Sequence, residues 1–296
     1  MGFLNNYRFI ANHPLTRDHK INALTRWLRW QIGSRVIGWP VAVPFVNATR
    51  LLVKPGMTGA TGNIYCGLHE FEDMAFVLHF LRPGDLFVDI GANIGSYTIL
   101  ASTTGANTIS FEPVPATYDA LRDNLHLNRL ESRVDARNQA VGRSIGTMEM
   151  IADQDTTNQA LHSGYCYAGK TILVPVVMLD DALQGAVPKV MKIDVEGFET
   201  EVLAGAAETL TDPDLQAVIM ELNGSGTRYN FDEESLHQQM ISFGFKPNRY
   251  EPNKRRLIDL NGQRSTSGNT LYLRNQPAAQ ALISQSNMYR VLGIEL

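Results

Sequence analysis

The rhythm of apolar positions changes at about residue 56 of this chain. From there on, short apolar runs of strand length alternate with segments in which apolar residues recur every three or four positions, the period of an amphipathic helix. Expected strands cover residues 85–91, 107–113, 133–141, 147–152, 171–179, 189–197, 216–224, 245–251 and 269–275. Expected helices cover residues 72–82, 95–103, 116–128, 199–210 and 233–244.

This alternation predicts an α/β fold. Strands joined through helices pair in parallel, and the helices then cover both faces of the sheet. We expect seven strands from Asp85 onward in one mostly parallel sheet, with an antiparallel last strand because its connection is short. The two strands at 147–152 and 171–179 are harder to place, and the polar residues 153–170 between them are expected to form a loop over the site. A ligand would bind beyond the carboxyl end of the 85–91 strand.

The ends of the chain differ from this pattern in charge. Residues 1–55 carry eight Lys and Arg against Asp18 alone, a net charge of +7, so the remainder carries −11 of the total of −4. With 296 residues, the chain is long enough for one large domain with an extension. We predict a basic, partly helical extension over 1–55, an α/β domain over 56–275 and a C-terminal tail over 276–296.

The basic segment contains an expected helix over residues 20–35, with an apolar stripe formed by Leu24, Trp27, Leu28 and Ile32. Two interpretations are open. The commoner one is that the stripe packs on the acidic body of the protein. The other is that the helix, which also carries Arg26, Arg29 and Arg35, forms a peripheral contact with an anionic lipid or an anionic substrate.

Cysteine usage and apolar segments bear on location. The two cysteines, Cys66 and Cys166, lie far apart without a CxxC pair, which supports neither a disulfide framework nor a zinc site. The start of the chain lacks the features of a signal peptide, and the apolar stretch 36–46 is too short to span a bilayer. A cytoplasmic location is therefore expected. The acidic body argues against a nucleic-acid partner.

The stretch FVDIGANIGSYTI, residues 87–99, carries the first candidate chemistry. Gly91 and Gly95 allow a sharp turn after Asp89, and the helix that begins near Ser96 offers unpaired N–H groups to an anion. The glycine spacing is GxxxG, unlike the GxGxxG of dinucleotide sites, and the Lys-Ser/Thr of a phosphate-binding loop is missing. Because Asp89 would repel a pyrophosphate but can accept from an ammonium group, the turn suits the amino-acid part of a ligand.

Polar residues also follow the next two strands. Glu112, with Pro113 after it, ends the second strand, where a carboxylate can accept from both hydroxyls of a ribose. Gln139 and Ala140 end the third strand, where they could border an adenine. An amino acid, a ribose and an adenine together make up S-adenosyl-L-methionine, which we predict as the cofactor.

Several segments, PGDLFVDIGANIGSYT, FEPVPATYDALRDNLHLN, NQAVG and LDDAL followed by VMKIDVEGFETEVLAGA, resemble the FkbM-type S-adenosylmethionine-dependent methyltransferases. The resemblance runs from about Gly67 to Asn223, and KIDVEGFE is its most specific part. It implies a class I Rossmann-like methyltransferase fold and, for most members, O-methylation of a hydroxyl on a sugar or polyketide-type product. The acceptor would then be a small molecule or a glycan. The cofactor residues that it implies are Asp89, Gly91, Asn93, Gly95 and Glu112.

The KIDVEG segment carries the candidate catalytic residues. Lys192, Asp194 and Glu196 alternate along the expected strand, so their side chains fall on one face and converge at its carboxyl end. In methyl transfer to a hydroxyl, the oxygen must lose a proton, which a nearby carboxylate can accept. We favour Asp194 or Glu196 as this base, Asp194 first, with Lys192 pairing them. The alternative is a structural ion pair between Lys192 and Glu196.

Other polar residues near these motifs are weaker candidates. Glu70, beside His69, precedes the first motif and could reach the amino-acid end of the cofactor, although acids at a helix start are common. His162 in the expected loop and Asn223 after the 216–224 strand could face the acceptor, but structural or solvent-facing roles are the commoner explanation. The absence of an HExxH motif leaves a metal site without support.

Two other classes of function stay open at the level of sequence. A nicotinamide-dependent oxidoreductase would also place Glu112 on a ribose, but the GxxxG turn counts against it. A non-catalytic cofactor-binding protein on the same fold is the second, and the intact set from Asp89 to Glu112 argues against it. N-methylation of a nucleic-acid base is disfavoured, because no Asn/Asp-Pro-Pro-aromatic tetrapeptide stands at the KIDVEG position.

Overall fold

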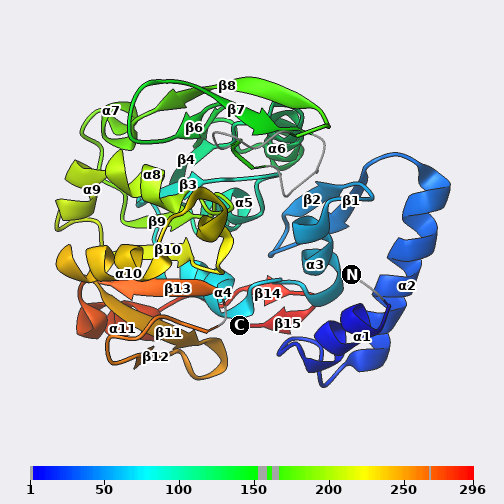
Figure 1. The fold of residues 1–296 in the computed structure, drawn as a ribbon. Helices are drawn as coiled ribbons and strands as arrows, with labels where there is room; N and C mark the ends of the chain where they lie inside the picture. Colours follow the sequence, from blue (N-terminus) through cyan, green and yellow to red (C-terminus); the bar gives the residue numbers. More distant parts are fainter. Residues whose placement is uncertain (1–2, 153–158, 162–166, 267) are drawn as a thin grey trace.

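The architecture comes from a computed structural model, which describes residues 3–152, 159–161, 167–266 and 268–296. The strands of its main sheet are β3 (Leu86–Ile90), β4 (Asn107–Phe111), β5 (Val134–Arg137), β9 (Val190–Ile193), β10 (Ala217–Glu221), β11 (Lys246–Glu251), β12 (Arg256–Asp259) and β13 (Asn269–Leu273). They lie side by side in the order β12-β11-β13-β10-β9-β3-β4-β5 (Figure 1).

The directions of these strands confirm the predicted fold class. Strands β5, β4, β3, β9 and β10 pair in parallel. Strand β13, the last of the sheet along the chain, runs antiparallel to both β10 and β11. The seven predicted strands are present, and the sheet gains one more, β12, as an edge hairpin with β11. Because only four residues, RLID, form this edge strand, their pattern is too short to predict it.

Helices cover both faces of the sheet (Figure 1). One face carries α4 (Phe71–Phe80), α5 (Ser96–Thr103), α6 (Pro115–Asn128) and α11 (Gln276–Ser284), and the other carries α7 (Leu179–Leu183), α8 (Glu199–Ala204), α9 (Ala207–Thr211) and α10 (Glu233–Ser242). Successive side chains along each strand point to opposite faces of the sheet. Phe87 therefore belongs to one hydrophobic core and Val88 to the other. Within the described ranges, no helix combines the length and apolarity needed to cross a bilayer.

One prediction about these helices needs correction. The helix expected over 199–210 is interrupted at Gly205, whose missing side chain lets its backbone approach Gly142: a Cβ there would lie 2.0 Å from the Gly142 carbonyl oxygen. In α6, Leu121 and Leu125 are buried, whereas Leu127 is 37% exposed. Two short 3-10 helices, η2 (Ser225–Tyr229) and η3 (Pro252–Lys254), complete this part of the chain.

A second, three-stranded sheet forms from β6 (Ala140–Val141), β7 (Gly146–Ile151) and β8 (Thr171–Val177), in the order β6-β8-β7. The strand expected over 133–141 is therefore divided, because the chain leaves the main sheet after Arg137 to pair with β8. The predicted loop over the site falls largely on residues 153–158 and 162–166, with His162, and these lie outside the described residues.

The N-terminal part forms α1 (Phe3–Asn12), α2 (Lys20–Ile37), β1 (Val41–Pro44), β2 (Arg50–Val53) and α3 (Thr58–Cys66), and the C-terminal end forms the β14 (Arg290–Val291) and β15 (Ile294–Glu295) hairpin. Ile10 and Leu51 are fully buried in the core that also lies under α4 and α5, and Val291 joins the same core. The divisions at residues 55 and 275 stay predictions; both flanking segments nevertheless pack on the α/β body.

Two asparagines of α6 join the N-terminal hairpin to the body. Asn124 and Asn128 are one helical turn apart, so both amides face β2. The backbone N–H groups of Leu52 and Arg50 donate to their Oδ1 atoms at 2.6 and 2.8 Å. The Asn128 Nδ2 donates back to the Arg50 carbonyl at 2.8 Å, and the Asn124 Nδ2 donates to the Ile94 carbonyl at 3.0 Å. The two amides thus satisfy the free edge of β2.

Helix α2 does not bury the face that its sequence predicts. Leu24 and Trp27 pack against the core, but Leu28 and Ile32 are exposed. The buried positions are Ala23, Trp30 and Ser34. The helix has apolar residues on two opposite sides, and periodicity alone could not show which side faces inward.

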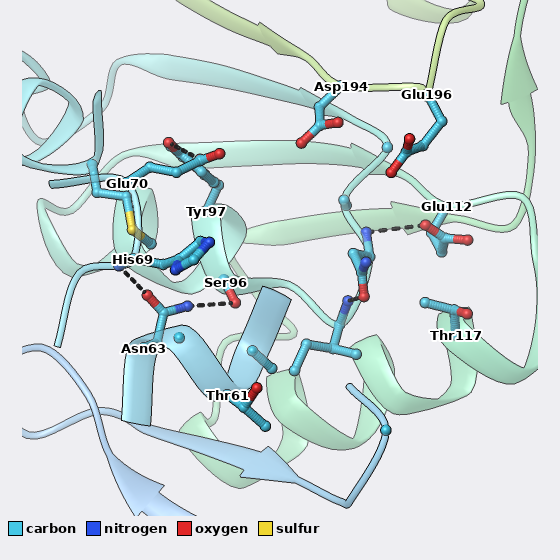
Figure 2. A pocket seen from close by; sticks show the side chains of 18 of the residues that line it. Thr61, Asn63, His69, Glu70, Ser96, Tyr97, Glu112, Thr117, Asp194 and Glu196 are labelled. Carbon is cyan, nitrogen blue, oxygen red and sulfur yellow. Dashed lines mark hydrogen bonds between the residues drawn. The ribbon is translucent and has the colours of Figure 1, made fainter. Parts of the chain in front are cut away.

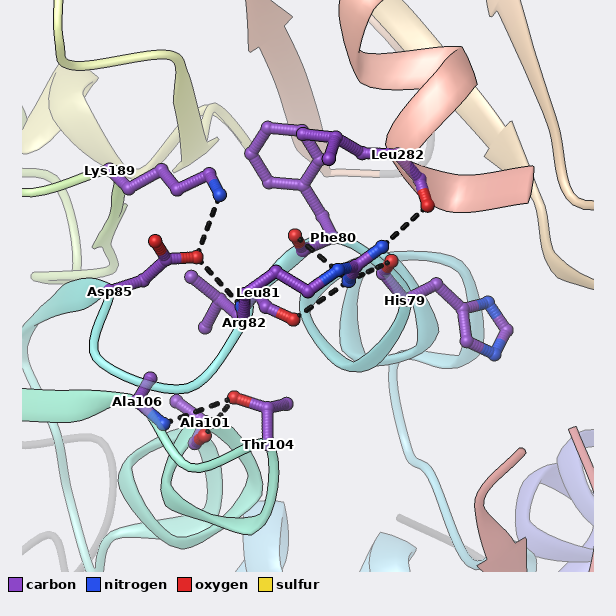
Figure 3. Close-up of polar contacts among 10 residues, drawn as sticks. All are labelled: His79, Phe80, Leu81, Arg82, Asp85, Ala101, Thr104, Ala106, Lys189 and Leu282. Carbon is purple, nitrogen blue, oxygen red and sulfur yellow. Dashed lines mark hydrogen bonds and ion pairs between the residues drawn. The ribbon is translucent and has the colours of Figure 1, made fainter. Parts of the chain in front are cut away.

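Arg82 holds the end of α4 (Figure 3). Its Nη1 donates to three carbonyl oxygens of the last turn, those of His79, Phe80 and Leu81, at 3.0, 3.3 and 2.9 Å. Its Nη2 donates to the Leu282 carbonyl in α11 at 2.5 Å, and its backbone N–H donates to Asp85 at 2.7 Å. Since the last carbonyls of a helix lack partners within the helix, this guanidinium satisfies them and joins two helices.

We expect Arg82→Met to lower the free energy of unfolding by about 2–4 kcal/mol, because several carbonyls lose a charged donor at once. Urea denaturation monitored by circular dichroism measures this decrease in the free energy of unfolding. The matched control is Arg133→Met, since Arg133 is exposed and its side chain donates only to the Gly105 carbonyl among the described residues. Equal losses in the two variants would contradict the proposed role of Arg82.

Candidate functional site

A cavity of about 960 Å³ lies at the carboxyl ends of β3, β4 and β9. Its walls come from the turns after these strands, from the last residue of β10, and from α1, α2 and α3. A volume of this size suits a cofactor with part of an acceptor. The location agrees with the position predicted from the sequence, where the strand order reverses beside β3.

The turn after β3 requires its glycines. Gly91 has φ +81°, and a Cβ there would lie 1.8 Å from the Asp194 carbonyl oxygen. Gly95 has φ +90°, and a Cβ there would lie 2.5 Å from Leu121 Cδ1. Asn93 also has a positive φ of 52°, and its Oδ1 accepts from the Ile94 N–H at 2.8 Å. Gly91 therefore allows a close contact between the β3 and β9 turns, and Gly95 allows a close contact with α6.

Asp89 is almost fully buried at the base of this turn. Its Oδ2 accepts from the Thr98 hydroxyl at 2.6 Å, whereas its Oδ1 has no hydrogen-bond partner among the described residues. Burial raises the pKa of Asp89, and the nearby Lys192 opposes that shift. A buried carboxylate oxygen without a partner is costly, so this atom fits a ligand that donates a hydrogen bond, such as an ammonium group.

Glu112 connects the turns after β3 and β4. Its Oε2 accepts from the Asn93 N–H at 3.0 Å, and its Oε1 accepts from the Val114 N–H at 2.9 Å. Burial raises the pKa of Glu112 to about 7. Each oxygen retains acceptor capacity, so the carboxylate can accept further hydrogen bonds from a ligand, and its contact with a ribose stays a prediction.

The residues that line the cavity wall beyond Glu112 are only in part the ones that the sequence predicts. Pro113, Val114, Thr117 and Met150 line the cavity there. Gln139 and Ala140 are not among its lining residues in the described structure, because Ala140 starts β6 and is buried in the small sheet. Asn138 takes a supporting position that was not predicted: its Nδ2 donates to the carbonyls of Glu112 and Pro113, both at 2.9 Å.

The KIDVEGFE segment forms a strand end and a tight turn. Strand β9 ends at Ile193, so Glu196 lies in the turn and not on the strand face that the alternation predicts. Glu196 and Gly197 both have positive φ, 54° and 98°, and the Glu199 carboxylate accepts from the N–H groups of Val195 and Gly197 at 3.2 Å each. A Cβ on Gly197 would lie 2.6 Å from the Ser225 backbone. The turn thereby directs Asp194 and Glu196 into the cavity (Figure 2).

Lys192 pairs with Asp194, at 2.6 Å between Nζ and Oδ2. Burial alone would lower the pKa of Lys192, but the carboxylates of Asp194, Glu70 and Asp89 raise it above its ordinary value. Its Nζ also lies 4.7 Å from the centre of the Tyr97 ring. Lys192 is therefore protonated, and it neutralises Asp194 instead of forming the alternative pair with Glu196.

Glu221, the last residue of β10, is a member of this cluster that the sequence analysis missed. Burial alone would raise the pKa of Asp194, but the charge of Lys192 and a hydrogen bond with Glu221 hold this pKa below its ordinary value. Burial and the neighbouring Asp194 raise the pKa of Glu221 to about 9. Glu221 is thus a neutral donor to an ionised Asp194 at neutral pH. The strand-end position of this acid, like that of Glu112, was the available signal.

The relation to known proteins agrees with this arrangement. The model of the methyltransferase FkbM domain family matches residues 89–247, more than half of the chain. The chain belongs to this family. Its matched range begins at Asp89 and contains Glu112, the KIDVEG turn and Glu221.

Two relatives are named methyltransferases. The 31-O-demethyl-FK506 methyltransferase FkbM of Streptomyces tacrolimicus is 31% identical over an alignment of 189 positions, and the match covers 52% of this chain and 72% of that protein. The hexuronic acid methyltransferase AglP of Haloferax volcanii is 32% identical over 157 residues, 52% of this chain and 62% of that protein.

A solved structure of a methyltransferase FkbM from Methylobacillus flagellatus has 18% sequence identity and a TM-score of 0.45, covering 75% of this chain and 56% of that chain. The chain thus spans less than two thirds of the crystallised protein and of AglP.

The opposite wall of the cavity in this FkbM-family protein comes from α3 and the start of α4. Glu70 accepts a hydrogen bond from the Tyr97 hydroxyl at 2.6 Å (Figure 2). Asn63 Oδ1 accepts from the His69 N–H at 2.7 Å, and Asn63 Nδ2 donates to the Ser96 hydroxyl at 3.3 Å. Burial lowers the pKa of His69, so its ring is neutral at neutral pH. Glu70 and Ser96 line the cavity as predicted, whereas Asn223 is exposed and accepts from the Ser225 N–H.

The N-terminal helices supply the remaining wall, which the sequence analysis did not anticipate. Arg8 and Phe9 of α1 and Trp30, Gln31 and Arg35 of α2 line the cavity. The family match begins only at residue 89, so no motif marked these positions. No cluster that could hold a metal ion occurs among the described histidines, cysteines and acids.

Proposed function

We propose that this FkbM-family protein is an S-adenosyl-L-methionine-dependent O-methyltransferase that acts on a hydroxyl of a sugar, a glycan or a related natural product. The observation that carries this proposal is that Asp89, whose buried Oδ1 has no partner among the described residues, lines the cavity together with Glu112. The two carboxylates match an ammonium group and a ribose at adjacent strand ends. The family membership supports transfer of a methyl group.

The charges of the cavity fit this cofactor, which supplies a methyl group on a positively charged sulfur. Glu70, Asp89, Asp194 and Glu196 face the cavity, and Lys192 is the cation among them on this wall. Asp89 would hold the amino group, Glu112 the ribose, and Val114 with Met150 the adenine. The N–H groups at the start of α5 would hold the carboxylate.

Asp194 and Glu196 differ in proton affinity, and we assign them different roles. Lys192 keeps Asp194 ionised, so its charge can stabilise a cation beside it but it is a weak base. Burial raises the pKa of Glu196, and the charge of Asp194 raises it further. A carboxylate with a raised pKa is the better proton acceptor at neutral pH, so Glu196 takes the proton of the acceptor hydroxyl in this proposal.

The acceptor class rests on the relatives and on the cavity. The names of two relatives specify an oxygen of FK506 and a hexuronic acid. Oxygen is therefore the proposed target atom here. A screen for transfer of a labelled methyl group to nucleotide sugars, lipid-linked sugars and glycans tests this class. Labelling of one of these hydroxyl compounds is expected, whereas transfer only to nitrogen or carbon acceptors would contradict it.

We expect Glu196→Gln to lower kcat by about 10²–10⁴-fold, the usual contribution of a general base. In the parent enzyme, kcat should rise with pH through the raised pKa of Glu196, because only the ionised carboxyl accepts a proton. That rise should disappear in the variant. A pH profile of kcat measures both effects, with Glu201→Gln as the control, since Glu201 pairs with Arg143 away from the cavity lining. An unchanged profile in Glu196→Gln would exclude this role.

A further inference from the structure

Helix α2 carries a second apolar stripe on the side that faces away from the body. Its members on the helix, spaced by seven, four and four residues, are Ile21, Leu28, Ile32 and Val36, which are 80%, 51%, 59% and 80% exposed. Trp39, two residues beyond the end of the helix, is 76% exposed. Spacing of this kind places side chains on one helical face. Single exposed aliphatic residues are ordinary, but an aligned row on one helix marks an interaction surface.

The opposite side of α2 is fixed to the protein. Ala23 and Trp30 are buried there, Arg26 Nη2 donates to the Tyr65 carbonyl at 2.8 Å, and Gln31 Nε2 donates to the Tyr65 hydroxyl at 3.0 Å. Figure 1 shows α2 at the margin of the molecule, beside α1 and away from the main sheet. The exposed stripe is therefore held outward by a packed helix, and its exposure does not come from a detached one.

Basic residues accompany the stripe. Lys20, Arg29 and Arg35 are exposed on α2, and none of them has a carboxylate partner among the described residues. Segment 1–55 carries +7, whereas the remainder of the chain carries −11. An apolar face with a tryptophan at its end and cations beside it is the arrangement that binds an anionic bilayer surface, because aliphatic groups enter the acyl boundary and cations stay at the headgroups.

We infer that the outer face of α2 seats this protein on an anionic lipid bilayer. A second copy of the chain is a poorer occupant, because a twofold contact through this helix would bring the same unpaired cations of both copies together. Arg35 and Gln31 also line the cavity, so a bilayer-bound enzyme holds the cavity wall formed by α2 next to the membrane surface. This inference does not depend on the identity of the transferred group.

Sedimentation of the full chain with vesicles tests the inference. The protein should partition onto vesicles that contain phosphatidylglycerol and much less onto phosphatidylcholine alone. Leu28→Ser with Ile32→Ser should lower partitioning by at least about tenfold, from the apolar area that is lost. The matched control is Leu173→Ser with Ile145→Ser, because both residues are exposed elsewhere, at 75% and 70%. Equal loss in both double variants, or no binding by the parent protein, would overturn it.

Charge and contact are tested separately. Lys20→Gln with Arg29→Gln should weaken binding by about fivefold for each charge removed, whereas Arg122→Gln with Lys246→Gln, exposed residues elsewhere, should not. Bromine-labelled lipids should quench the fluorescence of Trp39, and Trp39→Phe should lose that quenching. Sedimentation equilibrium without lipid measures whether the parent protein is a dimer. If it is a dimer, and the double variant Leu28→Ser with Ile32→Ser is a monomer, the exposed face of α2 binds a second copy and the lipid inference is overturned.

Discussion

Asp89→Ala is expected to weaken the binding of S-adenosylhomocysteine by roughly 10²-fold, which is the scale of a lost charged hydrogen bond at a buried site. In the parent protein, Asp89 Oδ1 is buried and has no partner among the described residues, so an ammonium group would complete its hydrogen bonding. Isothermal titration calorimetry measures the change. Asp119→Ala is the control, because Asp119 is exposed on α6 and does not line the cavity.

Asp89 also accepts from Thr98, so its removal affects the protein as well as the ligand. Asp89→Asn separates the two effects, because an amide keeps the shape and one acceptor oxygen but removes the charge. Asp89→Asn should retain most of the free energy of unfolding, measured in urea. It should still bind S-adenosylhomocysteine, with a lower affinity than the parent protein. Unchanged affinity in both Asp89 variants would remove this residue from the cofactor site.

Asp194→Asn is expected to leave the affinity for S-adenosylhomocysteine within about threefold and to lower kcat by about 10²–10³-fold, the scale of one electrostatic contact made at the reacting centre. In the parent protein, Asp194 is ionised beside Lys192 and faces the cavity from the end of β9. The acceptor oxygen gains positive charge as it takes up the methyl group, and the carboxylate of Asp194 would stabilise that charge more strongly than an amide would. Single-turnover kinetics with the labelled cofactor measure the chemical step.

The loss of Asp194 also leaves Lys192 buried without its partner, a change that can destabilise the fold. The double variant Lys192→Met with Asp194→Asn removes both charges and controls for this effect. If the double variant is stable and still slow, the loss belongs to the chemistry. Normal turnover in a folded Asp194→Asn would exclude Asp194 from the mechanism.

Local chemistry made the turn after β3 predictable from the sequence. Asp89, Gly91 and Gly95 stand within one strand-turn-helix unit, and each glycine has a positive φ and a close neighbour that a side chain would hit. The same holds for Glu112, which lies at the end of a strand with a clear apolar pattern. These positions depend on residues that are near one another in the chain, so the pattern of the segment is sufficient to find them.

The positions of Glu196 and Ala140 differ from the prediction because they depend on where a strand ends. Alternation along the KIDVEG segment predicts a strand as far as Glu196, but β9 ends at Ile193 and the backbone then turns through two residues with positive φ. Likewise, Ala140 departs with β6 after β5 ends. A period of two describes a strand and does not show where the strand stops.

The cavity wall from the N-terminal helices was beyond sequence reasoning for a different reason. Arg8, Trp30 and Arg35 reach the site only through long-range packing of α1 and α2 on the body. Because α2 is apolar on two opposite sides, its sequence supports docking through either one. The structure shows that Ala23 and Trp30 face inward, and this leaves Leu28 and Ile32 outside.

The central claim is that the cavity beside Asp89 and Glu112 binds S-adenosylmethionine and not a dinucleotide. The most direct measurement is the shift in melting temperature of the full chain with increasing S-adenosylhomocysteine, compared with NAD at the same concentrations. A ligand that binds the native state stabilises it in proportion to the logarithm of its concentration above Kd. We predict that Tm rises with the logarithm of the S-adenosylhomocysteine concentration and does not change with NAD. Stabilisation by NAD alone would contradict the presence of a site for S-adenosylmethionine.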